Sequence, residues 1–193
     1  MIMTFHHHKQ LDAMDCGPTC LRMIARHYGR SYSLQNLRER CHITREGVSM
    51  LGISDAAESI GFRATGVKIT WEQLRDEMPL PSIVHWNRRH FVVVYEIRKR
   101  RGEYVVKVAD PASGLLTYTE EAFCRACLQA GKDNEGDDSV SANTHGIALM
   151  LEPTPKFYEE KGDEEKKFGF GYILGYLRPY KSFIVQILLA MLV

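Results

Sequence analysis

The chain has 193 residues, enough for one well-buried domain with an appendage. It carries 25 basic and 24 acidic side chains, and this formal net charge of +1 gives no indication of nucleic-acid binding. The five cysteines are odd in number and irregularly spaced, which argues against a disulfide scaffold and for reduced thiols in the cytosol. The N-terminus lacks the basic and apolar segments of a secretory signal.

Three helices are predicted in the first third of the chain, over residues 17–28, 33–41 and 49–60. In the first of them, apolar side chains recur at helical spacing, and Gly29 follows as a natural C-terminal stop. Ser33 and Ser49 are the predicted N-caps of the other two helices. Cys16 is therefore expected at the N-terminal end of the first helix.

The chain then changes to segments rich in β-branched and aromatic residues, which predict an antiparallel sheet. The predicted strands cover residues 62–69, 82–86, 91–95, 104–108, 115–118 and 146–151. A capping-box pattern at residues 70–73 predicts a short helix after the first strand, and another short helix is predicted near residues 119–129. The expected fold class is α+β, with the N-terminal helices packed on the antiparallel sheet.

Three features are expected in the C-terminal part of the chain. Residues 132–141 are polar and acidic without periodicity, which predicts a mobile loop. Residues 153–167 are expected to form a charged linker after a catalytic domain at residues 1–152. Residues 168–193 are expected to form a membrane-interface segment and then the truncated start of a first transmembrane helix, because the chain is almost wholly apolar from residue 182.

Cys16 is the candidate nucleophile. A thiol attacks a carbonyl as its thiolate, and the partial positive charge of a helix N-terminus favours the thiolate. Gly17 would let a substrate backbone approach closely and Pro18 suits the first helical turn, so the local sequence predicts an exposed nucleophile. The alternative is that Cys16 is a small buried core residue, which is a common role for cysteine.

His90 and Asp110 are the candidate partners of this thiol. Each lies at the end of a predicted strand, and a hairpin centred near residues 100–101 would set His90 opposite Asp110. An aspartate that accepts a hydrogen bond from one imidazole nitrogen leaves the other nitrogen free to take the thiol proton. The alternative for Asp110 is ordinary turn chemistry, because Pro111 follows it.

Further polar side chains have weaker signals. Gln10, six residues before the candidate nucleophile, is the candidate amide donor of an oxyanion hole. His85 is the rival histidine, but it lies inside a predicted strand, where a core or sheet-face role is expected. Cys124 and Cys127 have a redox or half-zinc spacing, but no second pair of ligands follows them, so we expect a structural role.

The segment from Gln10 to Cys20, QLDAMDCGPTC, closely resembles the start of C39 peptidase domains, which begin bacterial peptidase-containing ABC transporters. The resemblance extends over roughly residues 5–151, with His90 before a hydrophobic strand and Asp110 between Ala109 and Pro111 matching in order and spacing. It implies a papain-like cysteine peptidase in which Cys16, His90 and Asp110 form the triad and Gln10 belongs to the oxyanion hole.

The resemblance also implies a function. Domains of this kind remove the leader peptides of bacteriocins and related peptides after a double-glycine site. The implied partners are such a leader peptide and the transmembrane and ATPase domains of a longer, homodimeric chain, with no nucleic acid. No cofactor is expected for this domain, and ATP is expected only in a domain beyond residue 193. The full-length protein would lie in the inner membrane, with this domain on its cytoplasmic side.

Two other classes of function stay open. A C39-like domain can bind substrate or regulate a transporter without cutting, although such domains typically replace the catalytic cysteine. A redox or metal-sensing module on a membrane anchor would need a reversible dithiol or a bound zinc ion. The histidine run at residues 6–8 is interpreted as a solvated N-terminal arm, and no metal is assigned to it.

Overall fold

The computed structural model describes residues 5–44, 47–128, 145–159 and 162–163, together with isolated residues near the C-terminus. The chain divides into two compact units, Met1–Asp163 and Glu164–Val193. The predicted loop at residues 132–141 and most of the segment at 168–193 lie outside the described residues. Within the described part, no helix has the length and apolar character needed to cross a membrane.

The first third of the chain is helical, as predicted. A single 3-10 turn, η1 (Ala13–Asp15), runs directly into α1 (Cys16–His27), which is followed by α2 (Leu34–Arg40) and α3 (Met50–Ser59). The side chains of Ser33 and Ser49 each accept a hydrogen bond from the backbone N–H three residues later. Both predicted N-caps are therefore confirmed.

A six-stranded antiparallel sheet follows, which confirms the α+β fold class. Its strands are β1 (Phe62–Ile69), β2 (Ser82–Trp86), β3 (His90–Arg100), β4 (Glu103–Asp110), β5 (Gly114–Thr119) and β6 (Gly146–Pro153). Their order across the sheet is β1-β6-β2-β3-β4-β5, so that β6 lies between the first two strands of the sequence. Strands β2 to β5 lie side by side in the order in which they follow in the sequence. The start of β3, at His90, therefore lies near the end of β4, at Asp110.

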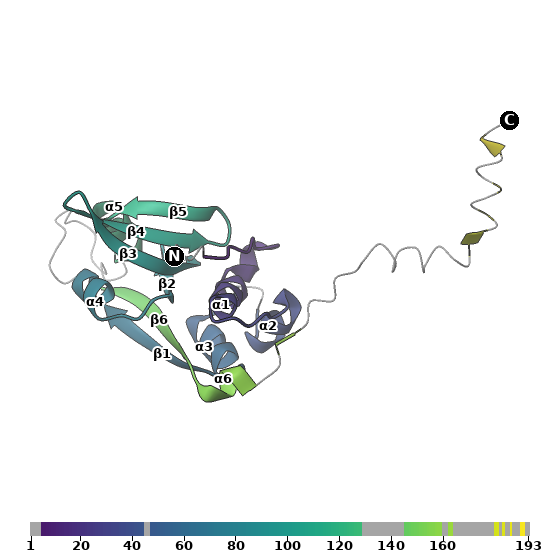
Figure 1. The fold of residues 1–193 in the computed structure, drawn as a ribbon, viewed down its shortest axis with the longest axis horizontal. Helices are drawn as coiled ribbons and strands as arrows, with labels where there is room; N and C mark the ends of the chain where they lie inside the picture. The colour runs from purple at the N-terminus through teal and green to yellow at the C-terminus, as the bar shows by residue number, and fades with distance from the viewer. Residues whose placement is uncertain are drawn as a thin grey trace. The chain divides into compact units, whose positions relative to one another are not determined.

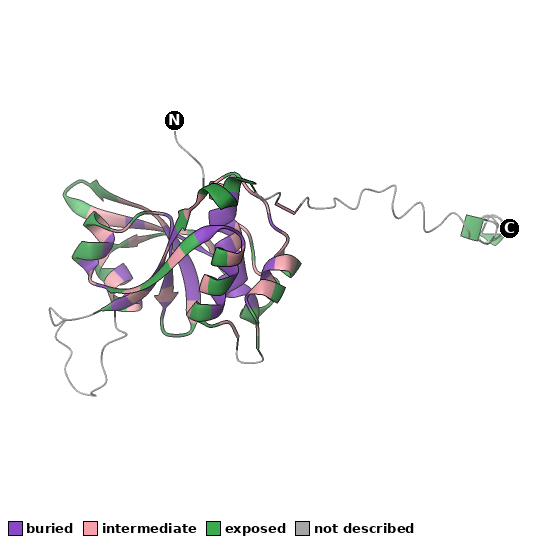
Figure 2. Cartoon of the chain, turned by 90° about the horizontal axis from the view of Figure 1, so that it is seen from below, coloured by how far each residue is buried: buried purple, intermediate pink, exposed green. Residues whose placement is uncertain are grey.

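Helices cover both faces of the sheet. On one face lie α1, α2 and α3; on the other lie α4 (Trp71–Asp76) and α5 (Glu120–Cys127), and Figure 1 shows the two groups apart. Side chains in β3 alternate between two hydrophobic cores: Phe91 and Val93 join the first core, and Val92 and Val94 join the second. Figure 2 shows that buried positions concentrate between the helices and the sheet.

The stretch assigned to a linker begins with a helix, α6 (Pro155–Glu159). Phe157 in this helix is fully buried, and its ring centroid lies 4.4 Å from that of Phe62. The Thr154 hydroxyl donates a hydrogen bond of 2.6 Å to the carbonyl oxygen of Gly61. The compact unit therefore continues past β6 and back to the start of β1.

Candidate active site

Cys16 begins α1, as predicted, but its side chain is not exposed. The residue is only 5% exposed and belongs to the first hydrophobic core. All residues of the first helical turn, from Cys16 to Cys20, are buried. The prediction of an exposed nucleophile is therefore wrong, because the turn that holds the thiol is packed inside the helical part of the fold.

Gly17 is explained by this packing. A Cβ atom at Gly17 would lie 2.5 Å from Cγ1 of Val48 and 2.6 Å from Cδ1 of Ile53. Ile53 is fully buried in α3, so it has little room to move away. Glycine at this position therefore lets α1 approach α3 beside the thiol, whereas the sequence had suggested that it lets a substrate backbone approach.

His90 and Asp110 come together. The Nε2 atom of His90 lies 2.7 Å from Oδ1 of Asp110. The predicted register is wrong, however: Val93 pairs with Ala109, and continuing that register sets Asp110 opposite Val92 rather than His90. The side chains still meet because residues two positions apart on a strand lie on the same face, so His90 and Asp110 are diagonal neighbours.

The pKa values of the two groups move in opposite directions. Burial by itself lowers the pKa of His90, but hydrogen bonds to Cys16 and Asp110 outweigh it, so the pKa is raised above its ordinary value. Burial by itself raises the pKa of Asp110, but hydrogen bonds from His90, Ala112 and Ser113 lower it overall. The arrangement favours an imidazolium between a carboxylate and a thiol.

The N-terminal arm contacts the loop after Asp110. The backbone N–H of Gln10 donates to the carbonyl oxygen of Pro111 at 3.0 Å, and Nε2 of His7 lies 2.8 Å from the carbonyl oxygen of Asp110. The Oε1 atom of Gln10 is buried and has no hydrogen-bond partner among the described residues. The backbone of Gln10 is thus fixed beside the loop that follows Asp110, while its side-chain oxygen makes no hydrogen bond within the described residues.

The remaining candidates have ordinary packing roles. His85 stacks on Phe91 with ring centroids 4.9 Å apart, and burial, followed by the charge of Arg88, lowers its pKa. Burial raises the pKa of Cys124 to about 11 and that of Cys127 to about 12. Across the described ranges, no group of three His, Cys, Asp or Glu side chains is arranged to hold a metal ion.

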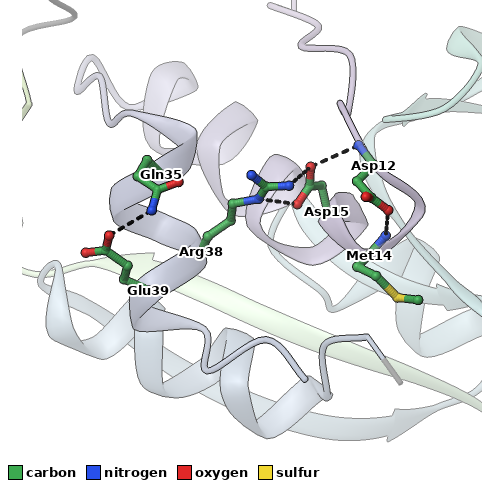
Figure 3. Close-up of polar contacts among 6 residues, drawn as sticks. All are labelled: Asp12, Met14, Asp15, Gln35, Arg38 and Glu39. Carbon is green, nitrogen blue, oxygen red and sulfur yellow. Dashed lines mark hydrogen bonds and ion pairs between the residues drawn. The ribbon is translucent and has the colours of Figure 1, made fainter. Parts of the chain in front are cut away.

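An ion pair next to Cys16, between the buried Asp15 and the partly exposed Arg38, was not predicted from the sequence. Arg38 of α2 donates from Nε to Oδ1 of Asp15 at 2.6 Å and from its terminal nitrogen to Oδ2 at 2.9 Å (Figure 3). The Asp15 side chain is fully buried, whereas that of Arg38 is 34% exposed. Asp15 lies in the motif around Cys16, but nothing in the sequence links it to an arginine 23 residues later.

An open pocket of about 500 Å³ lies beside this ion pair. Its lining residues come from η1, α2 and the turn after α2: Asp12, Met14, Asp15, Gln35, Arg38, Glu39, His42 and Ile43. Cys16, His90 and Asp110 do not line it. The Arg38 side chain, which is 34% exposed, therefore faces solvent at this pocket.

Cys20 lies one helical turn after Cys16 and ties α1 to β3. Its thiol donates a hydrogen bond of 3.3 Å to the carbonyl oxygen of Phe91, the residue after His90. Complete burial, together with the nearby Cys16 and Asp110, raises the pKa of the Cys20 thiol well above its ordinary value. Cys20 is therefore a poor nucleophile and contributes to the packing of α1 on the sheet.

Comparisons with known proteins converge on one family. The sequence profile described as "Peptidase C39 family" matches residues 4–126. The chain is 35% identical over 123 residues to the lactococcin-G-processing and transport ATP-binding protein LagD of Lactococcus lactis, covering 60% of this chain and 17% of that protein. It is 32% identical over 116 residues to the colicin V secretion/processing ATP-binding protein CvaB of Escherichia coli, covering 60% of this chain and 16% of that protein.

The fold is also similar to that of a solved peptidase. A double glycine motif protease from an AMS/PCAT transporter, crystallised with its leader peptide, matches with a TM-score of 0.65 and 28% identity, covering 78% of this chain and 93% of the other. The two curated relatives are far longer than this chain, which spans about a sixth of their length. The family match at residues 4–126 includes Cys16, His90 and Asp110 and lies within the compact unit Met1–Asp163.

Proposed function

Because the chain belongs to the Peptidase C39 family, we propose that it cleaves a leader peptide from a secreted precursor after a double-glycine site, with Cys16 as the nucleophile. The single observation that carries this proposal is the 2.7 Å contact between Nε2 of His90 and Oδ1 of Asp110, which leaves Nδ1 of His90 as the nitrogen that would accept the proton of the Cys16 thiol. A carboxylate, an imidazole and a thiol in series are what acyl transfer requires.

The reaction would begin with proton transfer from the Cys16 thiol to His90. Because Nε2 of His90 lies against Asp110, its other ring nitrogen, Nδ1, takes that proton. The thiolate attacks the carbonyl carbon of the second glycine, and the oxyanion is stabilised by the Cys16 backbone N–H and the side-chain amide of Gln10. Collapse of the intermediate expels the amine of the mature peptide, which His90 protonates, and leaves a thioester on Cys16.

Water completes the reaction. His90, neutral after it has protonated the leaving amine, takes a proton from the water as it attacks the thioester carbonyl. The second tetrahedral intermediate then releases the leader carboxylate and returns the proton to the Cys16 sulfur. Asp110 holds the imidazole in one orientation and stabilises the imidazolium in both stages. Every step uses groups of the protein and a water molecule, so the proposal includes no cofactor.

Leader peptides are the proposed substrates because of what the similar proteins process. The names of LagD and CvaB refer to processing of lactococcin G and colicin V, and the solved structure holds a leader peptide. We further propose that the chain is part of a longer protein with transmembrane and ATPase domains beyond residue 193. That protein would assemble as a homodimer, with the peptidase unit on the cytoplasmic side of the inner membrane. ATP would bind in the ATPase domain.

The test is cleavage of defined precursors by the purified chain. The lactococcin G and colicin V precursor peptides are mixed separately with the wild-type chain and with Cys16→Ala, and the products are identified by mass spectrometry. We expect one cut, after the second glycine of the leader, that is lost in Cys16→Ala. Binding of both precursors without any cut would contradict the proposal and would favour a non-cleaving substrate-binding domain.

A further inference from the structure

We propose that Asp15 and Arg38 are positioning residues that fix the backbone at Cys16, and with it both the thiol and the amide N–H that acts on the oxyanion. This inference rests on the proposed function and adds a second set of residues to it. The pair shares no residue with the His90–Asp110 contact, and no step of the proposed reaction uses it.

The Asp15 carboxylate is fully occupied by hydrogen bonds. Arg38 donates two, at 2.6 and 2.9 Å, and the backbone N–H of Asp12 donates a third to Oδ2 at 3.0 Å. Figure 3 shows the guanidinium and the carboxylate facing one another across the space between η1 and α2. The side chain of Asp15, the residue before Cys16, thus connects the start of the 3-10 turn to α2.

Asp15 has the position of an N-cap but does not act as one. It precedes the first residue of α1, yet its side chain makes no cap hydrogen bond to that helix. An aspartate at this position usually accepts from the free N–H groups of its own first turn. Here the carboxylate turns toward α2 instead, which leaves the N–H groups at the start of α1 without this acceptor and available to an oxyanion.

Arg38 provides a fixed point for this contact. Leu37, its neighbour in α2, is fully buried in the first core, and Ser33 caps the start of the helix. The guanidinium is planar and binds a carboxylate through two parallel hydrogen bonds, which fixes angle as well as distance. A lysine at position 38 would keep the charge but lose this two-point geometry.

Energetics favour a positioning role over a purely stabilising one. Only the Asp15 carboxylate is fully desolvated, since the Arg38 side chain is 34% exposed. The desolvation cost of that carboxylate offsets much of the attraction within the pair, while removal of Arg38 would leave an unpaired buried charge. An unpaired carboxylate at Asp15 would also repel the thiolate of the adjacent Cys16. Arg38 therefore holds the turn in one conformation and neutralises the charge nearest the nucleophile.

On its other side, α1 is held by the sheet. The Cys20 thiol donates to the carbonyl oxygen of Phe91, so α1 is tied to β3 one turn after the nucleophile. The Asp15–Arg38 pair ties the beginning of the same helix to α2. With both ties in place, Cys16 has a defined position relative to His90, which directly precedes Phe91. Loss of the first tie would let the start of α1 move while the later turns stay in place.

The test compares Arg38→Lys, Arg38→Gln and Asp15→Asn with Glu39→Gln in the 193-residue chain. Glu39 follows Arg38 in α2, but its carboxylate is exposed and accepts a hydrogen bond from Gln35 at 2.8 Å, so it is a matched control for charge on this helix (Figure 3). Values of kcat and KM are measured with the lactococcin G precursor. The rate of Cys16 alkylation by iodoacetamide is measured between pH 5 and 9 by peptide mapping, which needs no substrate.

We expect Arg38→Lys and Arg38→Gln to lower kcat by about tenfold or more, because a displacement of about 1 Å at a nucleophile costs up to about a hundredfold. KM should stay within about twofold, and Cys16 alkylation at pH 7 should slow in parallel with kcat. Asp15→Asn should also lower kcat, because it breaks the two-point contact with Arg38. Its Cys16 should be alkylated faster than that of Arg38→Gln, because no unpaired negative charge remains beside the thiolate. Glu39→Gln should match the wild type.

Wild-type kcat and alkylation rate in folded Arg38→Lys and Arg38→Gln would overturn the proposal, as would a change in KM alone. Circular dichroism establishes folding, and Arg38→Lys, which keeps the charge, is decisive if Arg38→Gln unfolds. If the wild-type chain cuts neither precursor, the proposed function fails, but the alkylation comparison still decides the positioning role. Equal alkylation in all variants would then contradict it, and slower alkylation in the Arg38 variants would support it.

Discussion

His90 lies between two groups that raise its pKa together. Its burial opposes protonation, yet the hydrogen bonds to the Cys16 thiol and the Asp110 carboxylate reverse that effect. Asp110 in turn has a lowered pKa, so it is ionised at neutral pH and supports a positive charge on the imidazole. The two shifts together favour an imidazolium on His90 beside an ionised Asp110 carboxylate.

Asp110→Asn should shift the alkaline limb of the pH–activity profile. The asparagine keeps a hydrogen-bond acceptor but removes the negative charge that raises the His90 pKa, so the imidazolium is lost at lower pH. The alkaline limb of kcat/KM should move down by about one pH unit or more. Asp55→Asn, an exposed change of the same charge on α3, is the control. An alkaline limb at the wild-type pH in Asp110→Asn would show that Asp110 does not act on His90.

Gln10→Ala should reduce kcat more than it changes KM. Loss of one oxyanion-hole donor lowers kcat by about 100- to 1,000-fold, because the donor acts on charge that develops only in the transition state. Gln35→Ala, an exposed change of the same type on α2, serves as the control. Steady-state kinetics with a precursor peptide measure both. A kcat for Gln10→Ala within about threefold of the wild-type value would remove Gln10 from the oxyanion hole.

The contact between two candidate residues was easier to predict than the geometry around it. Residue type and the ends of predicted strands indicate Cys16, His90 and Asp110 as candidates, and the structure places His90 and Asp110 in contact. The hairpin turn was misplaced by about one residue: Arg101 and Gly102, at φ values of 53° and 93°, form the turn. A two-residue turn of this kind requires positive φ at both positions, which Gly102 tolerates best.

At the scale of elements, α6 closes the first hydrophobic core. Its Phe157 packs against Phe62 of β1 and Tyr28 at the end of α1, with centroid distances of 4.4 and 6.5 Å. Gly61 has a φ of 94° and passes so close to the backbone of Phe157 that a Cβ atom there would overlap it. Helix α6 therefore packs the C-terminal end of the compact unit against β1 and against the end of α1, the helix that begins with Cys16.

Phe157→Ala should destabilise the unit substantially. Truncation of a buried phenylalanine costs about 3–5 kcal/mol, because both the transfer free energy and the packing around the cavity are lost. Tyr158→Ala is the matched control, since Tyr158 is 51% exposed in the same helix. Urea unfolding followed by tryptophan fluorescence gives the free energy of unfolding for each variant. Equal destabilisation by the two substitutions would show that α6 does not pack as described.

Elements with local signals were predicted, and those that depend on distant contacts were not. The bounds of β1 and β2 match the predicted ranges because alternation and flanking turns are local features. The capping box at Thr70 and Gln73 is confirmed for the same reason. By contrast, α6 has two prolines nearby and five residues, too few to show a periodicity, and its formation depends on the buried site that β1 and α1 provide for Phe157.

At the scale of the whole molecule, the proposed chemistry lies within one compact unit. Met1–Asp163 contains Cys16, His90, Asp110 and Gln10, and the family match at residues 4–126 falls inside it. The antiparallel type of the sheet was predictable, but the order of its strands was not: β6 pairs with both β1 and β2, although it begins at Gly146, far along the chain from the ends of β1 at Ile69 and of β2 at Trp86. No local pattern specifies such a pairing.

A chain that ends at Asp163 should cleave as well as the 193-residue chain. Asp163 accepts hydrogen bonds from the Ser33 hydroxyl at 3.0 Å and the Asn36 side chain at 3.2 Å, so it completes the N-terminal end of α2. We expect kcat/KM for a precursor peptide to agree within about twofold between the two chains. A chain that ends at Pro153 should be less stable because it lacks α6. Loss of cleavage in the chain ending at Asp163 would place part of the active site beyond it.

The most direct measurement is covalent capture of the nucleophile by a substrate-like leader. A lactococcin G leader that ends in a Gly-Gly chloromethyl ketone presents a carbon that a thiolate attacks with loss of chloride, and peptide mapping then identifies which of the five cysteines carries the thioether. The account predicts labelling at Cys16 alone, slowed by free leader peptide and by His90→Ala. Labelling at Cys124, or equal labelling of Cys16 with a scrambled leader, would contradict a leader peptidase built on Cys16.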